Sequence, residues 1–139
     1  MKKFLALLAA LLIFSLVLAG CGGGSKGGSA STNLKVNLTE FMFSPNDFTI
    51  PAGQEITIEL SNTGAVVHDF IIMKYGTNIG DAFGDEDAPN VYWKAELEPG
   101  TSNTYTFTAP SEPGDYQVVC GVAGHYQAGM VATLTVVAE

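Results

Sequence analysis

The sequence predicts an all-β sandwich, and three observations support this fold class. Apolar and polar residues alternate with a period of two in short runs, as in strands with one buried face. Turn residues separate these runs, for example Pro51-Ala52-Gly53, Pro99-Gly100 and Pro113-Gly114. No segment keeps the apolar spacing of a helix over a typical helix length, and no internal repeat is present. At 139 residues, the chain has room for one domain of this kind.

The N-terminal segment has the pattern of an export signal. Lys2 and Lys3 precede an apolar run that begins at Phe4 and ends in Leu18-Ala19-Gly20-Cys21. A short basic start, an apolar middle and small residues before a cleavage point are typical of a secretory signal. The end of the run resembles the lipobox of bacterial lipoproteins, in which the cysteine is acylated and becomes the new N-terminus. We therefore predict a lipoprotein signal peptide over residues 1–20 and lipidation at Cys21.

An uncleaved membrane helix is the alternative interpretation, because residues 4–20 just reach the roughly 17–25 apolar residues that span a bilayer. Both interpretations place the rest of the chain outside the cytoplasm, attached to a bacterial membrane on its periplasmic or cell-surface side. After Cys21, residues up to 32 are rich in glycine and serine. This composition predicts a flexible linker over residues 21–32, with an average span of roughly 18 Å. The folded domain is then expected over residues 33–139.

Strand-like alternation recurs along this domain. Apolar residues keep a single parity in the segments 34–38, 48–50, 56–60, 66–72, 105–107, 116–120 and 130–136. This parity places His68, Cys120 and Met130 on the core-facing side of their strands. Residues 74–100 break the pattern and are predicted to form a long irregular loop, with a short helix or an additional strand as the open alternative. The acidic residues in this loop are expected to be solvated: Asp81, Asp85, Glu86 and Asp87.

The net charge of the exported chain is strongly negative. Removal of Lys2 and Lys3 leaves four of the six basic residues against fourteen acidic ones, which gives a charge of about −10. Such a surface disfavours binding to nucleic acid or to anionic lipid headgroups, since phosphate binding needs clustered lysine or arginine. Two explanations of the charge stay open: solubility, and electrostatic steering towards a basic partner.

Three metal-binding side chains lie near the C-terminus at regular spacing. Four residues separate Cys120 from His125, and four separate His125 from Met130. Glycines between them, such as Gly124, let the backbone wrap tightly. His68 lies upstream as a fourth candidate ligand, expected to arrive from a neighbouring strand across the sandwich. Thiolate, imidazole and thioether groups together point to copper, zinc or iron-sulfur clusters.

The cysteine content supports metal ligation. The chain has two cysteines, and acylation of Cys21 would leave Cys120 as a single thiol in an exported protein. An unpaired cysteine in that setting needs a chemical reason. Taken one at a time, His68 is typical of a core histidine whose hydrogen bonds are satisfied within the protein. Cys120 and Met130 are each typical of ordinary core residues. The coincidence of these side chains with His125 favours a single metal site.

The pattern Cys120-x4-His125-x4-Met130 with an upstream His68 resembles the cupredoxin family, which includes plastocyanin and azurin. The segment from His125 to Met130 and the lipidated N-terminus most resemble its auracyanin branch. The resemblance covers residues 34–137 and implies a cupredoxin-like Greek-key β-sandwich with one mononuclear type 1 copper. It implies that His68, Cys120 and His125 bind the copper in a near-trigonal plane. Met130 would be the weak axial ligand, and electrons would pass through the ring edge of His125.

Two further expectations concern the surroundings of the copper. Many family members carry an asparagine after the first histidine ligand, where this chain has Asp69. A carboxylate cannot donate a hydrogen bond as an amide does, and its charge close to copper would favour Cu(II) and lower the reduction potential. The alternation, however, points the Asp69 side chain away from the core. We also expect small residues around the metal to form an apolar docking patch: Gly121, Val122, Ala123, Gly64 and Ala65.

The predicted function is a membrane-tethered carrier that passes single electrons between exported redox proteins by Cu(II)/Cu(I) cycling. Cytochromes or a membrane oxidoreductase complex are the expected partners, and the protein is expected to be a monomer. No catalytic residues are predicted, because His68 and His125 are the two histidines of the chain and both are used as ligands. A Cys120–His125 nucleophile pair stays open on composition alone. The main alternative is a copper chaperone, storage protein or sensor, and the last is a metal-free adhesion-like sandwich.

Overall fold

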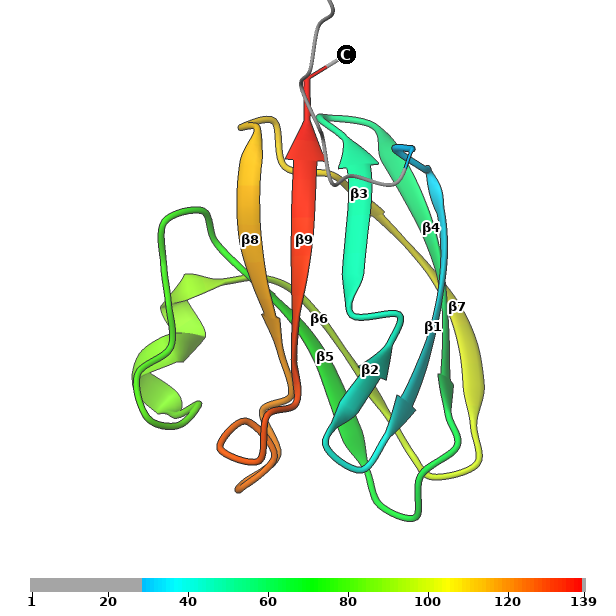
Figure 1. The fold of residues 1–139 in the computed structure, drawn as a ribbon, viewed down its shortest axis with the longest axis vertical. Coiled ribbons are helices and arrows are strands. Elements are labelled where there is room, and N and C mark those ends of the chain that lie inside the picture. Colours follow the sequence, from blue (N-terminus) through cyan, green and yellow to red (C-terminus); the bar gives the residue numbers. More distant parts are fainter. Residues whose placement is uncertain (1–28, 139) are drawn as a thin grey trace, which may run out of the picture.

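Two β-sheets pack face to face in the structure, a computed structural model that describes residues 29–138 (Figure 1). The predicted signal peptide, the predicted lipidation site Cys21 and the linker up to residue 28 lie outside the described residues. A single 3-10 helix, Asp85–Asn90, interrupts the strands of the described chain. The strands are β1 Asn33–Thr39, β2 Met42–Ser44, β3 Asp47–Pro51, β4 Glu55–Asn62, β5 His68–Met73, β6 Val91–Leu97, β7 Ser102–Thr108, β8 Gly114–Val119 and β9 Val131–Val137.

Both sheets are mixed. The first has the strand order β2-β1-β4-β7, with β1 parallel to β4, and the second has the order β3-β9-β8-β5-β6, with β3 parallel to β9. The other neighbouring strands are antiparallel. The predicted all-β sandwich is thus confirmed. Alternation does not predict the partners and directions of the strands, because it identifies a buried face and not a neighbour.

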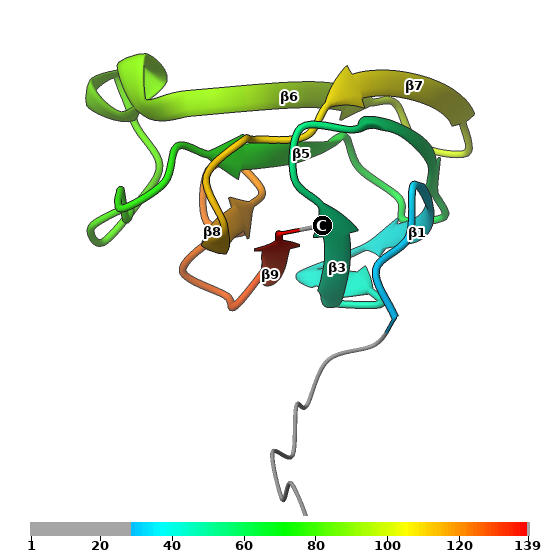
Figure 2. The same ribbon diagram turned by 90° about the horizontal axis from the view of Figure 1, so that it is seen from above.

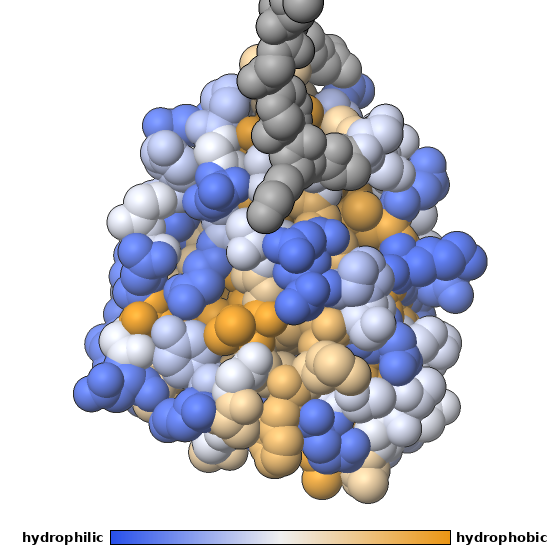
Figure 3. Space-filling view, in the orientation of Figure 1, coloured by the Kyte–Doolittle hydropathy of each residue, from blue (hydrophilic) through white to orange (hydrophobic). Residues whose placement is uncertain are grey.

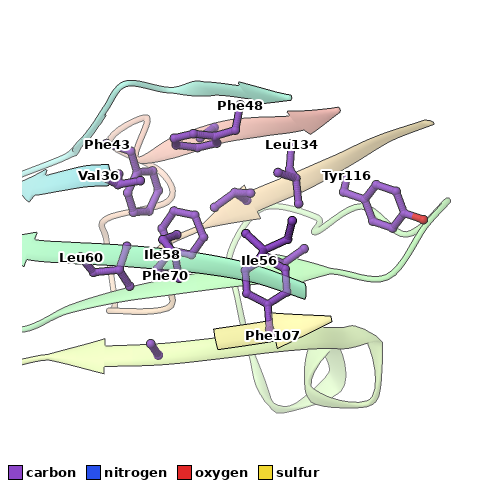
Figure 4. Close-up of a cluster of buried hydrophobic side chains, with 14 of the residues drawn as sticks. Val36, Phe43, Phe48, Ile56, Ile58, Leu60, Phe70, Phe107, Tyr116 and Leu134 are labelled. Atoms are coloured by element: carbon purple, nitrogen blue, oxygen red, sulfur yellow. The ribbon is translucent and has the colours of Figure 1, made fainter. Parts of the chain in front are cut away.

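The core lies between the two sheets and is built by strands with one buried face. Every second residue of β4 is buried, as the alternation of residues 56–60 predicts. Aromatic rings meet in the middle of the core, where Phe70 packs edge-on against Phe43 and Phe48 with ring centroids 5.4 Å and 5.9 Å apart (Figure 4). Full burial of each such side chain contributes about 1.5–3 kcal/mol. This packing makes the sandwich a rigid support for the loops at its ends.

Strand β5 is buried on both faces, whereas the alternation predicted one. Phe70 and Ile72 belong to the main core, and Ile71 and Met73 pack in a second cluster with Ile79. Ile79 lies in the segment that follows β5, and its N–H donates to Gln117 Oε1 of β8 at 3.0 Å. Figure 2 shows this segment looping out beside β8. The strand also begins at His68 and not at residue 66, which is exposed.

The irregular loop expected over residues 74–100 is shorter than predicted. Residues 74–84 are irregular, but the 3-10 helix follows, and β6 then pairs antiparallel with β5. Along β6 the exposed residues Tyr92, Lys94 and Glu96 alternate with less exposed ones, so the sequence contains a strand signal at this position. One acidic residue of the segment is not solvated as expected. Asp87 is buried, and its carboxylate accepts a hydrogen bond from the Gly84 N–H at 2.9 Å.

The loops that connect β1 to β2, β4 to β5 and β8 to β9 lie at the same end of the sandwich (Figure 1). The described chain begins at residue 29 and finishes at residue 138 towards the opposite end. Within residues 29–138, no helix has the length and apolar character needed to cross a membrane. Two of these loops, β4–β5 and β8–β9, carry or directly precede all four predicted ligands.

Candidate metal centre

His68 and Cys120 come from neighbouring strands of the five-stranded sheet. His68 is the first residue of β5, and Cys120 directly follows β8. These strands pair antiparallel, with Ile71 opposite Val119, which brings the start of one strand to the end of the other. The expectation that His68 arrives from across the sandwich is therefore wrong. The inward direction predicted for both side chains agrees with their complete burial.

Three ligand atoms converge on one small volume. The Cys120 Sγ lies 3.4 Å from His125 Nδ1 and 3.9 Å from His68 Nδ1. The ligand atoms of the three residues all lie within 4.8 Å of one another, and all three residues are buried. The two imidazole rings are inclined at 47° with centroids 4.9 Å apart. Donor atoms at such separations can share one metal ion with bonds of about 2.0–2.3 Å.

The loop between β8 and β9 is closed by backbone hydrogen bonds. The N–H of Cys120 donates to the Met130 carbonyl at 3.3 Å, and the N–H of Met130 donates to the His125 carbonyl at 3.0 Å. Gly124 and Gly129 have φ values of +86° and +98°, a left-handed conformation that favours glycine. Met130 itself has no exposed surface. One closed loop thus carries the thiol, one imidazole and the thioether.

Burial controls the protonation of the ligands. It raises the pKa of the Cys120 thiol, because a desolvated thiolate is costly. Burial, followed by the neighbouring His125, lowers the pKa of His68. The His68 imidazole is therefore neutral at neutral pH, which is the form that binds metal. A bound metal ion supplies the positive charge that deprotonates a coordinating thiol.

Asp69 contacts the ligands through its backbone. Its N–H donates a hydrogen bond to Cys120 Sγ at 3.4 Å. The side chain points away from the main core, as the alternation predicts, but it is buried. A Cβ built on Gly121 would lie 2.9 Å from Asp69 Oδ2 and 3.1 Å from the ring of Phe83. Burial, followed by the nearby Glu96, raises the pKa of the Asp69 carboxyl, whose Oδ1 has no hydrogen-bond partner among the described residues.

The turn between β1 and β2 contacts the site and was not predicted. Phe41 has a φ of +65° and packs edge-on against the His125 ring, with centroids 5.4 Å apart. Glu40 accepts a hydrogen bond from the N–H of Ala65, in the loop that precedes His68. This bond is the main reason why the pKa of Glu40 is lowered. No motif marks the turn, because its left-handed residue is a phenylalanine and not the usual glycine.

Asn62 is the other residue near the site that the sequence analysis missed. It is buried at the end of β4, and its Nδ2 donates to the carbonyls of Val66 at 2.8 Å and Leu97 at 3.0 Å. Its Oδ1 accepts a hydrogen bond from the Gly64 N–H at 2.9 Å. These bonds tie the loop before His68 to the end of β6. The sequence does contain a signal for this residue, because its amide side chain stands at an inward position where the other inward residues of β4 are apolar.

The donor set fits a type 1 copper ion better than zinc. Two imidazoles and one thiolate, with a methionine nearby, are the ligands of blue-copper electron-transfer sites. Structural zinc sites instead use four ligands drawn from cysteine, histidine and carboxylates. The fourth residue here, Met130, is a thioether and suits copper.

Comparison with known proteins agrees with this assignment. Residues 5–136 match the family model described as a cupredoxin-like domain. The chain is 33% identical to auracyanin-A of Chloroflexus aurantiacus over 144 residues, which cover 86% of this chain and 88% of that protein. It is 26% identical to the copper-resistant cuproprotein CopI of Pseudomonas aeruginosa, over 83% of this chain and 81% of that protein.

A solved structure gives the same result. The crystal structure of dithionite-reduced auracyanin from Roseiflexus castenholzii aligns with a TM-score of 0.66 and 34% identity, covering 78% of this chain and 98% of that one. The resemblance seen in the sequence is thereby confirmed. His68, Cys120 and His125 converge as the residues that would hold a metal ion, and Met130 lies at the end of the same loop. The chain belongs to the cupredoxin-like family, whose cofactor is one type 1 copper ion.

Proposed function

We propose that this protein carries single electrons between redox proteins outside the cytoplasm. The observation that carries the proposal is the convergence of a buried thiol and two imidazoles within 4.8 Å on a rigid sandwich. Copper, when bound, supplies a one-electron Cu(II)/Cu(I) couple. Donors that are held in place by packed strands and a closed loop need little rearrangement between two oxidation states. Small rearrangement favours fast electron transfer.

His125 is the ligand best placed to pass electrons to a partner. It is 8% exposed, whereas His68, Cys120 and Met130 have no exposed surface. Its ring contacts both the buried His68 ring and the exposed Phe41. Electrons therefore have their shortest route to the surface through the His125 ring.

The surface around His125 suits a short-lived apolar contact. Phe41 and Met42 are 48% and 54% exposed, and Val66 is also exposed. Figure 3 shows apolar surface at the end of the molecule that carries these loops, and also across the middle of the same face. Aromatic residues and methionine are enriched at protein interfaces. The expected docking patch of small residues (Gly121, Val122, Ala123, Gly64 and Ala65) is thus extended by larger side chains that the sequence analysis did not include.

The proposal includes attachment to a membrane through lipidated Cys21, outside the cytoplasm. The signal-like residues 1–20 support it, as does the position of residue 29 towards the end opposite the ligand loops (Figure 1). An anchor at that end would leave the copper end free to meet a partner. Cytochromes or a membrane oxidoreductase complex are the proposed partners, and the strongly acidic chain would be steered towards a basic surface on them. A carrier of this kind works as a monomer.

Visible spectroscopy of the purified protein tests the copper function. Wild-type protein loaded with Cu(II) is expected to show an intense blue band from thiolate-to-copper charge transfer, which ascorbate bleaches and a mild oxidant restores. Cys120→Ser is expected to lose the band. Cys21→Ser is the matched control, and it should keep the band while releasing the protein from membranes. A wild-type protein that binds Cu(II) without colour would contradict the proposal.

A copper chaperone or storage role is the alternative, and the similarity to CopI favours it. The two roles differ in how the metal leaves. A carrier keeps its copper in the presence of a chelator and exchanges electrons rapidly with a basic cytochrome. A chaperone or storage protein transfers copper to the chelator and exchanges electrons slowly. The burial of the three converging ligands supports the carrier.

A further inference from the structure

The outer ring nitrogen of His68 is buried without an acceptor. Its Nε2 has no hydrogen-bond partner in residues 29–138, whereas its Nδ1 faces Cys120 Sγ at 3.9 Å. A histidine that binds metal through Nδ1 carries its proton on Nε2. Such N–H groups almost always donate to a carboxylate, a backbone carbonyl or water. The candidate acceptors are therefore groups close to Nε2 that a small side-chain movement would bring into hydrogen-bond distance.

Gly64 marks the small volume that His68 Nε2 faces. A Cβ built on Gly64 would lie 2.8 Å from Glu40 Oε1, 2.9 Å from His68 Nε2 and 3.2 Å from Asn62 Oδ1. All three distances are measured from the same Cβ position. The distance from His68 Nε2 to either oxygen therefore cannot exceed the sum of the two distances to that position. Glu40 and Asn62 are therefore two side chains that place an acceptor oxygen near His68 Nε2.

The hydrogen bonds of Asn62 leave Glu40 as the better acceptor. Asn62 Oδ1 already accepts from the Gly64 N–H, and Asn62 Nδ2 donates to two carbonyls that hold the amide in place. Glu40 lies on an exposed turn, and its carboxylate has about four acceptor positions. The N–H of Ala65 uses one of them. A charged acceptor also makes a stronger hydrogen bond than a neutral amide.

We propose that Glu40 accepts the Nε2–H hydrogen bond of metal-bound His68 and that its negative charge lowers the reduction potential of the site. This inference rests on the proposed copper function. Glu40 is a positioning residue, because it acts on the metal through His68. A carboxylate on the outer nitrogen makes the imidazole a stronger electron donor. The stronger donor and the charge itself both favour Cu(II) over Cu(I).

The same turn also supports the other histidine. Phe41, the residue after Glu40, packs edge-on against the His125 ring. Phe41 of the β1–β2 turn thus packs against one imidazole, and Glu40 lies near the other, although the turn contributes no ligand. This arrangement gives one short segment control over the electronic environment of one histidine and the exposure of the other.

Glu40→Gln tests the charge, because it removes the charge and keeps an acceptor oxygen. We expect about a tenfold loss of preference for Cu(II) over Cu(I). For a one-electron couple this equals a rise of about 59 mV in the midpoint potential measured by voltammetry. Glu98→Gln is the matched control, since Glu98 is exposed in the turn between β6 and β7 at the same end of the sandwich. Equal potentials for the two variants would overturn the proposal.

Nuclear magnetic resonance of the diamagnetic Cu(I) form tests the hydrogen bond itself. The His68 Nε2–H proton is expected to exchange slowly in wild type and in Glu40→Gln, and to be lost to exchange in Glu40→Ala. A signal that persists in Glu40→Ala would assign the acceptor to Asn62 and overturn the proposal. Failure of the proposed function would look different: the Cu(II) protein would be colourless, while the Nε2–H signal of the Cu(I) form would still depend on Glu40.

Discussion

The backbone N–H of Asp69 donates a hydrogen bond to the sulfur of Cys120 at 3.4 Å, and this bond joins the two strands that carry His68 and Cys120. Because the donor belongs to the main chain, the bond does not depend on the side chain at position 69. The carboxyl group instead lies on the other face of β5, close to Gly121. The backbone of this residue therefore contacts the sulfur, whereas its side chain could influence the copper only through its charge.

Asp69→Asn is expected to raise the reduction potential and to leave the blue band in place. The substitution removes a nearby carboxylate that favours Cu(II), whereas the N–H···S bond remains. Voltammetry measures the first effect and visible spectroscopy the second. Asp115→Asn, at an exposed position of β8, controls for the loss of one surface charge. An unchanged potential in Asp69→Asn would show that the carboxyl group does not tune the copper.

Gly64→Ala is expected to destabilise the protein and to weaken copper binding. The new Cβ would lie 2.8 Å from Glu40 Oε1 and 2.9 Å from His68 Nε2, so the loop or the ligand must move. Overpacking of this kind costs about 1–3 kcal/mol, which urea unfolding of the metal-free protein measures. Gly80→Ala is the control, because a Cβ at Gly80 meets no atom within 4 Å. Equal stability of the two variants would contradict the close approach at Gly64.

The ligands could be predicted because their information is local. His68, Cys120 and Met130 have the inward parity of the neighbouring strand residues, and three candidate ligands share one short loop, so parity and spacing were sufficient to name them as candidates. The prediction that His68 arrives from across the sandwich was wrong for a physical reason: His68 lies in the same five-stranded sheet as the strand before Cys120. Its position there depends on the pairing of β5 with β6 and β8, and these strands are distant in sequence. Local alternation contains no information on such pairing.

The residues that support the ligands could not be predicted in the same way. Glu40 and Phe41 reach the histidines only after the chain has reversed and the sheets have packed. Neither residue type is typical of a tight turn. Asn62 interrupts the apolar parity of β4, which is a visible signal, but its three partners lie on two other segments. Contacts across a turn can be predicted only once the folded backbone is known. The inward or outward direction of a strand residue can be predicted from the local sequence alone.

Asn62→Ala is expected to lower the free energy of unfolding by about 2–4 kcal/mol. The substitution leaves the carbonyls of Val66 and Leu97 and the N–H of Gly64 without the partner they have now. A buried polar group without a partner costs about 1–3 kcal/mol. Chemical denaturation measures the loss, and Asn103→Ala on the exposed face of β7 is the control, expected within about 0.5 kcal/mol of wild type. Similar values for both variants would show that Asn62 does not hold the loop.

Tyr116 links stability to alkaline pH. Its ring is buried, and its hydroxyl group donates to the Glu112 carbonyl at 2.7 Å. Burial, followed by the charge of Glu112, raises the pKa of Tyr116 above its ordinary value of 10.0. The unfolded chain therefore releases this proton at a lower pH than the folded protein does. The contribution of Tyr116 is fully present below about pH 10 and is lost as the pH rises towards the raised pKa.

Tyr116→Phe is accordingly expected to be less stable than wild type at neutral pH, by about 1 kcal/mol for the lost hydrogen bond. The variant has no hydroxyl to ionise, so it lacks the alkaline loss of stability that this group causes. Urea unfolding of both proteins between about pH 8 and pH 11 should show the difference between them shrinking as the pH rises. Curves that stay parallel across this range would show that the folded and unfolded forms release the Tyr116 proton at the same pH, against the effect of its burial.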